Sequence, residues 1–147
     1  MFYGSLNFRL LSNLFVWNEN SRLGIAFESS TGFTLPNGAV RSPEASWIRN
    51  ERWNLLKNEQ KEKFAPICPD FVVEIRSKSD EIKYLQEKMA EYIENGTQLA
   101  WLIDRFDDKV YLYKADEPVQ TLHSLKVKLS GDPILPGFLL DLESIIN

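Results

Sequence analysis

Apolar residues recur at helical spacing over the first twenty residues of the chain. Leu6, Leu10 and Leu14 are four residues apart, so in a helix their side chains share one face. This spacing predicts a helix that begins almost at the first residue and ends near Gly24.

Residues 25–48 carry the pattern of an antiparallel hairpin. A turn signal at residues 36–38, Pro-Asn-Gly, divides the stretch into one strand around 25–35 and another around 39–48. The lysine-rich stretch that follows, up to residue 69, predicts a short surface helix, because Pro66 and Pro69 would stop it.

Apolar and polar residues alternate between positions 70 and 76, which indicates a half-buried strand. One face of this strand carries Phe71, Val73 and Ile75. The other face carries two carboxylates and a guanidinium, which are those of Asp70, Glu74 and Arg76. Such a polar face is either an exposed, salt-bridged surface or part of a metal and phosphate site.

The second half of the chain predicts another helix and further strands. Ser79 or Asp80 is placed to cap the helix, Gly96 to end it, and its buried stripe comprises Ile82, Leu85, Met89, Tyr92 and Ile93. Two paired strands are expected at 99–103 and 110–113, and the chain should close with a short strand and helix. The order predicts an α/β or α+β layer in one domain over residues 1–147, with helices packed on a mixed sheet.

Composition narrows the classes of function. A chain of 147 residues that is 44% hydrophobic, with a net charge of −4, fits a compact globular domain without general attraction to nucleic acid. Contact with DNA would need a local basic patch, and one basic cluster exists, although such clusters are usually solvated helix surface. Its members are Arg49, Arg52, Lys57, Lys61 and Lys63. The single cysteine and the lack of a signal peptide or membrane span lead us to expect a cytoplasmic protein.

Strand geometry selects which carboxylates can share an ion. Asp70 and Glu74 are about 13 Å apart along a strand, so a partner for Glu74 must come from a neighbouring strand. Glu44, in the preceding strand, is the candidate, and two carboxylates with water suit Mg²⁺ or Mn²⁺. The alternative is that both are exposed acids paired with Arg41 and Arg76 across the ladder. Asp70 is either a strand-entry residue or an additional ligand.

A phosphodiester site also needs a cation near the scissile phosphate. Arg76 lies two residues beyond Glu74 on the same face and can stabilise charge, although its guanidinium cannot act as a base. Lys88 is the alternative, because it lies at the edge of the buried stripe of the second helix and its ammonium can reach over the sheet. An ordinary helical ion pair with Glu87 or Glu91 is the competing interpretation for Lys88.

Five segments together resemble the bacterial putative restriction endonuclease family of the PD-(D/E)XK nuclease superfamily. They are TGFTLPNGAVRSP at 31–43, PDFVVEIRSKSD at 69–80, LQEKMAEYIENG at 85–96, WLID at 101–104 and LPGF at 135–138. The resemblance implies a restriction endonuclease-like fold, with a helix, a three-stranded meander, a crossover helix and further strands. It also implies metal-dependent cleavage of DNA phosphodiester bonds.

Matched position by position, the resemblance assigns the two metal-binding acids to Glu44 and Glu74. It places Arg76 at the superfamily lysine position and makes Lys88 the helix-borne lysine that replaces it. Two departures stand out, because the family usually has aspartate where this chain has Glu44, and it usually has a further N-terminal segment.

Two hypotheses follow. In the first, the protein is a Mg²⁺- or Mn²⁺-dependent endonuclease in which an activated water attacks DNA. In the second, it keeps the fold as a weakened or inactive member that binds nucleic acid or protein, with a homodimer as one form. Loss of cleavage, rather than of binding, on Glu74→Ala would separate the two.

Overall fold

The computed structural model describes residues 2–146. The first half of the chain forms a long helix, four short strands and two short helical segments. They are α1 (Phe2–Ser21), β1 (Gly24–Glu28), β2 (Phe33–Thr34), β3 (Val40–Arg41), β4 (Ala45–Arg49), α2 (Asn50–Trp53) and the 3₁₀ helix η1 (Asn58–Lys61).

The second half begins with the strand that carries Glu74 and continues through a helix into five more strands. Its elements are β5 (Phe71–Ile75), α3 (Ile82–Glu94), β6 (Leu99–Asp104), β7 (Lys109–Lys114), β8 (Gln120–Leu122), β9 (Lys128–Ser130), β10 (Leu139–Asp141) and α4 (Leu142–Ile145).

Six strands form the central sheet, in the order β1-β4-β5-β6-β7-β8. β4 pairs antiparallel with both β1 and β5, whereas β5 and β6 are parallel and are joined by α3. A parallel pair requires such a crossover, because a tight turn cannot bring the chain back in the same direction. The predicted mixed sheet with a meander and a crossover helix is confirmed.

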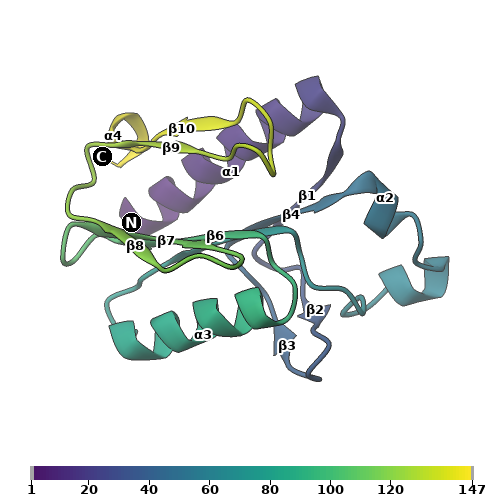
Figure 1. The fold of residues 1–147 in the computed structure, drawn as a ribbon. Coiled ribbons are helices and arrows are strands. Elements are labelled where there is room, and N and C mark those ends of the chain that lie inside the picture. Colours follow the sequence, from purple (N-terminus) through teal and green to yellow (C-terminus); the bar gives the residue numbers. More distant parts are fainter. Residues whose placement is uncertain (1, 147) are drawn as a thin grey trace.

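Helices cover the sheet on both faces, with α1 on one side and α3 on the other (Figure 1). The α1 face buries Leu6, Leu10 and Leu14 against Trp47 and Trp101. The α3 face buries Leu85 and Met89 in a second core with Ile48, Val72, Ala100 and Leu102. Strand β5 contributes alternate residues to both cores, so it is covered on both faces and all five of its residues are buried.

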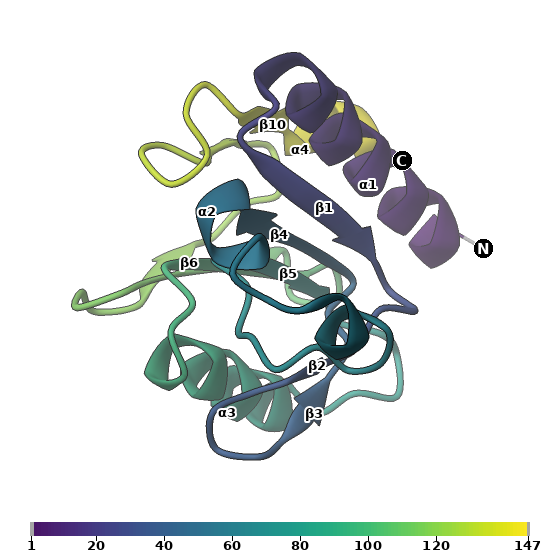
Figure 2. The same cartoon turned by 90° about the vertical axis from the view of Figure 1, so that its right-hand side faces the viewer.

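The predicted hairpin is divided into two layers. β1 pairs with β4 in the central sheet, while β2 and β3 form a separate two-stranded sheet around the predicted turn. The Glu28 carboxylate accepts a hydrogen bond from the Ser30 backbone N–H (3.0 Å), which turns the chain after β1. Pro43, which has no N–H to donate to a ladder, separates β3 from β4. The small hairpin lies beside α3 (Figure 2).

The predicted side-chain cap of α3 is wrong. The N-cap residue is Glu81, without a side-chain capping bond. The Asp80 carboxylate instead accepts hydrogen bonds from the Ser77 N–H (3.0 Å) and Oγ (2.7 Å), so it closes the turn that leaves β5. Gly96 ends the helix region in a left-handed conformation with φ of +120°, as expected.

The longest helix does not have the character of a membrane span. Within residues 2–146, no helix combines the length and the apolar character needed to cross a bilayer.

Candidate active site

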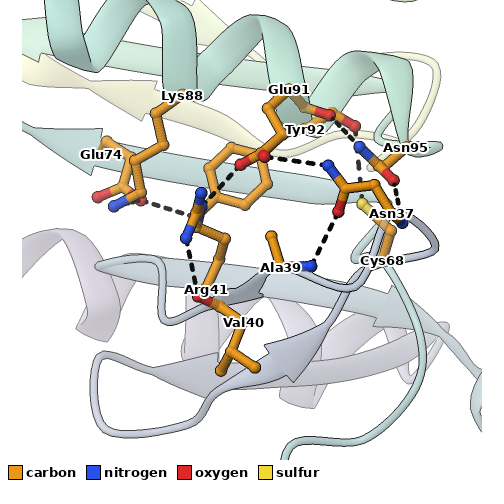
Figure 3. Close-up of polar contacts among 10 residues, drawn as sticks. All are labelled: Asn37, Ala39, Val40, Arg41, Cys68, Glu74, Lys88, Glu91, Tyr92 and Asn95. Carbon is orange, nitrogen blue, oxygen red and sulfur yellow. Dashed lines mark hydrogen bonds and ion pairs between the residues drawn. The ribbon is translucent and has the colours of Figure 1, made fainter.

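Glu74 is a buried carboxylate with two partners on α3. It points from β5 toward the helix and is 5% exposed. Its Oε2 lies 3.0 Å from the Lys88 Nζ and accepts a hydrogen bond of 2.8 Å from the Tyr92 hydroxyl (Figure 3). Lys88 and Tyr92 are four residues apart, so one helix face presents both groups to the same oxygen. Lys88 therefore pairs with Glu74, and the alternative of a helical ion pair with Glu87 or Glu91 did not anticipate this contact.

Burial shifts the acidity of this carboxyl. Desolvation raises the pKa of Glu74 above its ordinary value, and the ammonium of Lys88 and the Tyr92 hydroxyl partly oppose that rise. The nearby negative charge of Glu44 raises the pKa further. Burial and the carboxylate of Glu74 likewise raise the pKa of Tyr92, so its phenol stays protonated and acts as a donor.

Glu44 lies immediately before β4, in a bend outside the strand in which the sequence had placed it. The β4–β5 ladder begins one residue later, with Ala45 opposite Val73 and Ser46 opposite Val72. Side chains alternate along a strand, and Val72 belongs to the α3-side core, so Glu74 also faces α3. Glu44 is only partly buried, and its charge is near enough to raise the pKa of Glu74.

A small hollow of about 190 Å³ opens at Lys88, the partner of Glu74. It is lined by Arg41, Tyr84, Glu87, Lys88 and Glu91. Arg41 donates a hydrogen bond of 2.7 Å from Nε to Glu91 Oε1, and the Asn37 amide donates to Glu91 Oε2 at 3.0 Å. These contacts fasten the β2–β3 hairpin to α3 (Figure 3).

Sequence reasoning missed the contributions of Arg41, Glu91 and Tyr92 to this region. The helical spacing of Lys88, Glu91 and Tyr92 was visible in the sequence, but Tyr92 was assigned only to the core. The pairing of Arg41 with Glu91 crosses fifty residues of chain, and no local pattern indicates such a contact.

Asp70 lies at the other end of β5 from Glu74. Its carboxylate is 3.0 Å from Arg52 Nη1 and 3.7 Å from Arg49 Nε, and it accepts the Arg49 backbone N–H at 3.0 Å. This buried ion pair joins α2 to the start of β5. The structure therefore does not bring Asp70 together with Glu44 and Glu74, and the strand-entry interpretation describes its surroundings.

Arg76 has other partners than Glu74. Its Nη1 lies 2.9 Å from the carboxylate of buried Asp104 and 3.5 Å from that of Asp107, and its Nε donates to the Asp80 carbonyl. These contacts tie the segment after β5 to the end of β6. The cross-strand pairing of Glu44 and Glu74 with Arg41 and Arg76 is not found, because both arginines pair with other carboxylates.

The donor set fits a hard divalent cation with few protein ligands. Among residues 2–146, no group of three or more His, Cys, Asp or Glu side chains is arranged to hold a metal. A site in which protein side chains supply all the ligands is therefore not found in this part of the chain. Mg²⁺ typically takes only one or two carboxylates and keeps water or substrate phosphate as its other ligands. The two neighbouring acids Glu44 and Glu74, whose charges repel each other, fit that pattern.

Comparison with known proteins gives one family and one fold. A crystal structure described as a putative nuclease belonging to DUF820 from Anabaena variabilis superposes with a TM-score of 0.83 and 18% identity, covering 99% of this chain and 80% of that one. No curated protein sequence matches the chain. The model of the Uma2 family, described as "Putative restriction endonuclease", matches residues 2–143. The chain therefore belongs to the Uma2 family of putative restriction endonucleases.

Proposed function

We propose that this protein is a metal-dependent endonuclease that hydrolyses DNA phosphodiester bonds, with Glu44, Glu74 and Lys88 as its active-site residues. The observation that carries the proposal is the buried Glu74 carboxylate, held 3.0 Å from a lysine ammonium and under the influence of a second acid, Glu44, just before β4. Family membership supports nuclease-like function. The fold is shared with a structure described as a putative nuclease.

Each side chain has a distinct chemical task in this proposal. Glu44 and Glu74 would hold Mg²⁺ or Mn²⁺, which supplies Lewis-acid stabilisation and activates water when bound. Lys88 favours the ionised form of Glu74 against the effect of its burial, and it offers positive charge to a phosphate that enters the hollow. Tyr92 fixes the orientation of the Glu74 carboxylate through its hydroxyl. Arg76 supports the segment after β5 rather than contacting the phosphate, because two carboxylates already engage it.

Cleavage of plasmid DNA with Mg²⁺ or Mn²⁺ tests the proposal. We expect nicked and linear products that disappear with EDTA, and a rate at least a hundredfold lower in Glu74→Gln. Glu94→Gln is the matched control, because it removes a carboxylate from an exposed position on α3. Equal cleavage by Glu74→Gln and Glu94→Gln would contradict the assigned site.

Metal binding can be measured without catalysis. A ligand that binds only the folded protein stabilises it by RT ln(1 + [L]/Kd), about 2.7 kcal/mol at one hundred times Kd. We therefore expect Mn²⁺ to raise the melting temperature of the wild-type protein and of Glu94→Gln, but not of Glu74→Gln. An unchanged wild-type melting temperature at millimolar Mn²⁺ would argue against the metal site.

A second candidate is a binding module that has lost most of its catalytic power. It is favoured by Glu44, since the family resemblance leads us to expect aspartate there and a misplacement of about 1 Å can cost two orders of magnitude in rate. DNA binding that persists without turnover would identify this state. Glu44→Asp then distinguishes its cause, because a gain of cleavage would assign the loss to the longer side chain.

A further inference from the structure

A second, larger hollow lies on the same side of the sheet as the candidate active site. It encloses about 620 Å³, within the range of small-molecule pockets. Aromatic rings of Phe27, Trp53 and Phe64 line it, and Lys61 and Lys63 lie at its edge. It combines aromatic walls with cationic groups, the two features by which proteins hold single-stranded nucleic acid.

The hollow adjoins β1, which pairs with β4, the strand that follows Glu44. Phe27 pairs with Ser46 across β1 and β4, and it packs with Trp53 on the α3 side of the sheet. The hollow also reaches Gly32, where an added Cβ would lie 3.0 Å from Ser42 Oγ. Ser42 is two residues from Glu44, so the segment that leads into β4 joins the hollow to the candidate active site.

Phe64 is presented in an unusual conformation. Its ring is 56% exposed and its φ is +29°, a region that residues with side chains seldom occupy. Thr34 holds it there, since its Oγ1 donates to the Phe64 carbonyl at 2.8 Å and its N–H donates to the Ala65 carbonyl at 2.9 Å. A side chain at Gly32 would meet the ring at 2.8 Å. The fold thus fixes a large apolar ring at the surface.

The charges around the hollow differ from those in the rest of the basic cluster. Arg49 and Arg52 pair with Asp70, whereas Lys61 lies 5.3 Å above the Trp53 ring and Lys63 is exposed. Glu62, also on the lining, is the acid between these two lysines. The positive charge near the rings suits a phosphate attached to a stacked base.

We propose that this hollow binds an unpaired nucleotide of the DNA substrate, with its base stacked on Phe64 and its phosphate near Lys61 and Lys63. The preferred substrate is then DNA with a single-stranded stretch next to the scissile bond. This assignment rests on the proposed nuclease function for naming the strand a substrate. Stacking tolerates any base, so no sequence preference is expected at this position.

Binding is measured by fluorescence anisotropy of a labelled twelve-nucleotide oligothymidylate in EDTA, so that no cleavage occurs. Stacking is worth about 1–3 kcal/mol per base, so we expect Phe64→Leu to weaken binding about tenfold. Phe64→Tyr should stay within about threefold because it keeps a ring. Leu55→Ala, which shortens an apolar side chain that is 84% exposed and outside the lining, should bind as the wild-type protein does.

The lysines give an independent readout. Replacing Lys61 and Lys63 by glutamine should make the negative slope of log K against log salt shallower by about 0.7, since one single-strand phosphate contact contributes about 0.7. Melting curves show whether each variant is folded. Equal binding by Phe64→Leu and the wild-type protein, an unchanged salt slope, or equal affinity for a blunt duplex would each overturn the proposal.

Failure here is separable from failure of the proposed nuclease function. If plasmid is cleaved but Phe64→Leu binds normally, only the nucleotide pocket is refuted. If Phe64→Leu weakens binding and no metal supports cleavage, the pocket remains and the nuclease assignment fails.

Discussion

Replacing Lys88 by methionine should make the stability of the protein strongly dependent on pH. The substitution keeps the length and the apolar stem of the side chain but removes the charge 3.0 Å from the Glu74 carboxylate. A buried charge that loses its partner is costly, and the carboxyl can escape that cost by taking up a proton.

Protonation of the Glu74 carboxyl sets an upper limit to the stability that Lys88→Met can lose. Holding a carboxyl protonated costs about 1.36 kcal/mol for each pH unit above its ordinary pKa, which is 4.5 for Glu74. The limit is therefore about 3.4 kcal/mol at pH 7 and about 0.7 kcal/mol at pH 5. The wild-type pKa is already raised, so the measured loss should fall below these values.

The sign follows from proton linkage. Because the pKa of Glu74 is raised in the folded state, the folded protein binds this proton more tightly than the unfolded chain does. The resulting stability is present below pH 4.5 and is lost as pH rises through the folded pKa. Lys88→Met raises that pKa further. The free energy of unfolding of the variant should therefore drop further below that of the wild-type protein as pH rises from 5 to 7.

Urea unfolding followed by tryptophan fluorescence at pH 5, 6 and 7 measures this difference. Lys83→Met is the matched control, since Lys83 is an exposed lysine on α3. The double variant Glu74→Gln with Lys88→Met should recover most of the stability at pH 7, because no buried carboxylate remains. A loss for Lys88→Met that is as large at pH 5 as at pH 7 would refute the coupling of the two residues.

Three further predictions concern the same region and its supports. The acid limb of the pH–rate profile for DNA cleavage should lie above pH 4.5, because the raised pKa of Glu74 keeps its carboxyl protonated up to a higher pH. Measured as kcat/KM against pH, this limb should move to higher pH in Lys88→Met and stay in place in Lys83→Met. Arg41→Ala should destabilise the protein by about 1 kcal/mol or less, because the pair with Glu91 is partly exposed; hydrogen exchange should quicken in residues 35–41 and stay constant in β6. Arg76→Gln should lower the melting temperature, because it leaves the carboxylate of buried Asp104 without its cation. Its cleavage rate per folded molecule should change less than that of Lys88→Met. A larger change in Arg76→Gln than in Lys88→Met would show that Arg76 takes part in catalysis.

Local patterns predicted the elements that build the sheet. The four-residue spacing of Leu6, Leu10 and Leu14 predicted α1, and alternation around Glu74 predicted β5, because each pattern reports which side chains share a face. The division of the hairpin was not predicted. It depends on the turn after Glu28 and on Pro43, which act through backbone hydrogen bonds rather than through hydrophobic period.

Residue types and strand spacing predicted Glu44 and Glu74 as a metal-binding pair, which stays a prediction. The β4–β5 ladder begins one residue after Glu44, with Ala45 opposite Val73, so Glu44 lies beside the ladder and not in it. The partners of the arginines were not accessible in the same way. Arg41 pairs with Glu91, and Arg76 with Asp104, and each contact joins elements whose relative position is fixed by packing.

The sequence by itself determined the order of helices and strands, because that order depends on apolar periods of 2 and 3.6 residues. It also proposed Glu44 and Glu74 as a pair, which stays a prediction. Only the tertiary structure decided that Lys88, rather than Arg76, neutralises Glu74. It also decided that Asp70 belongs to a separate ion pair. The physical reason is that long cationic side chains can reach several carboxylates, and the packing of α3 and α2 on the sheet selects which one they meet.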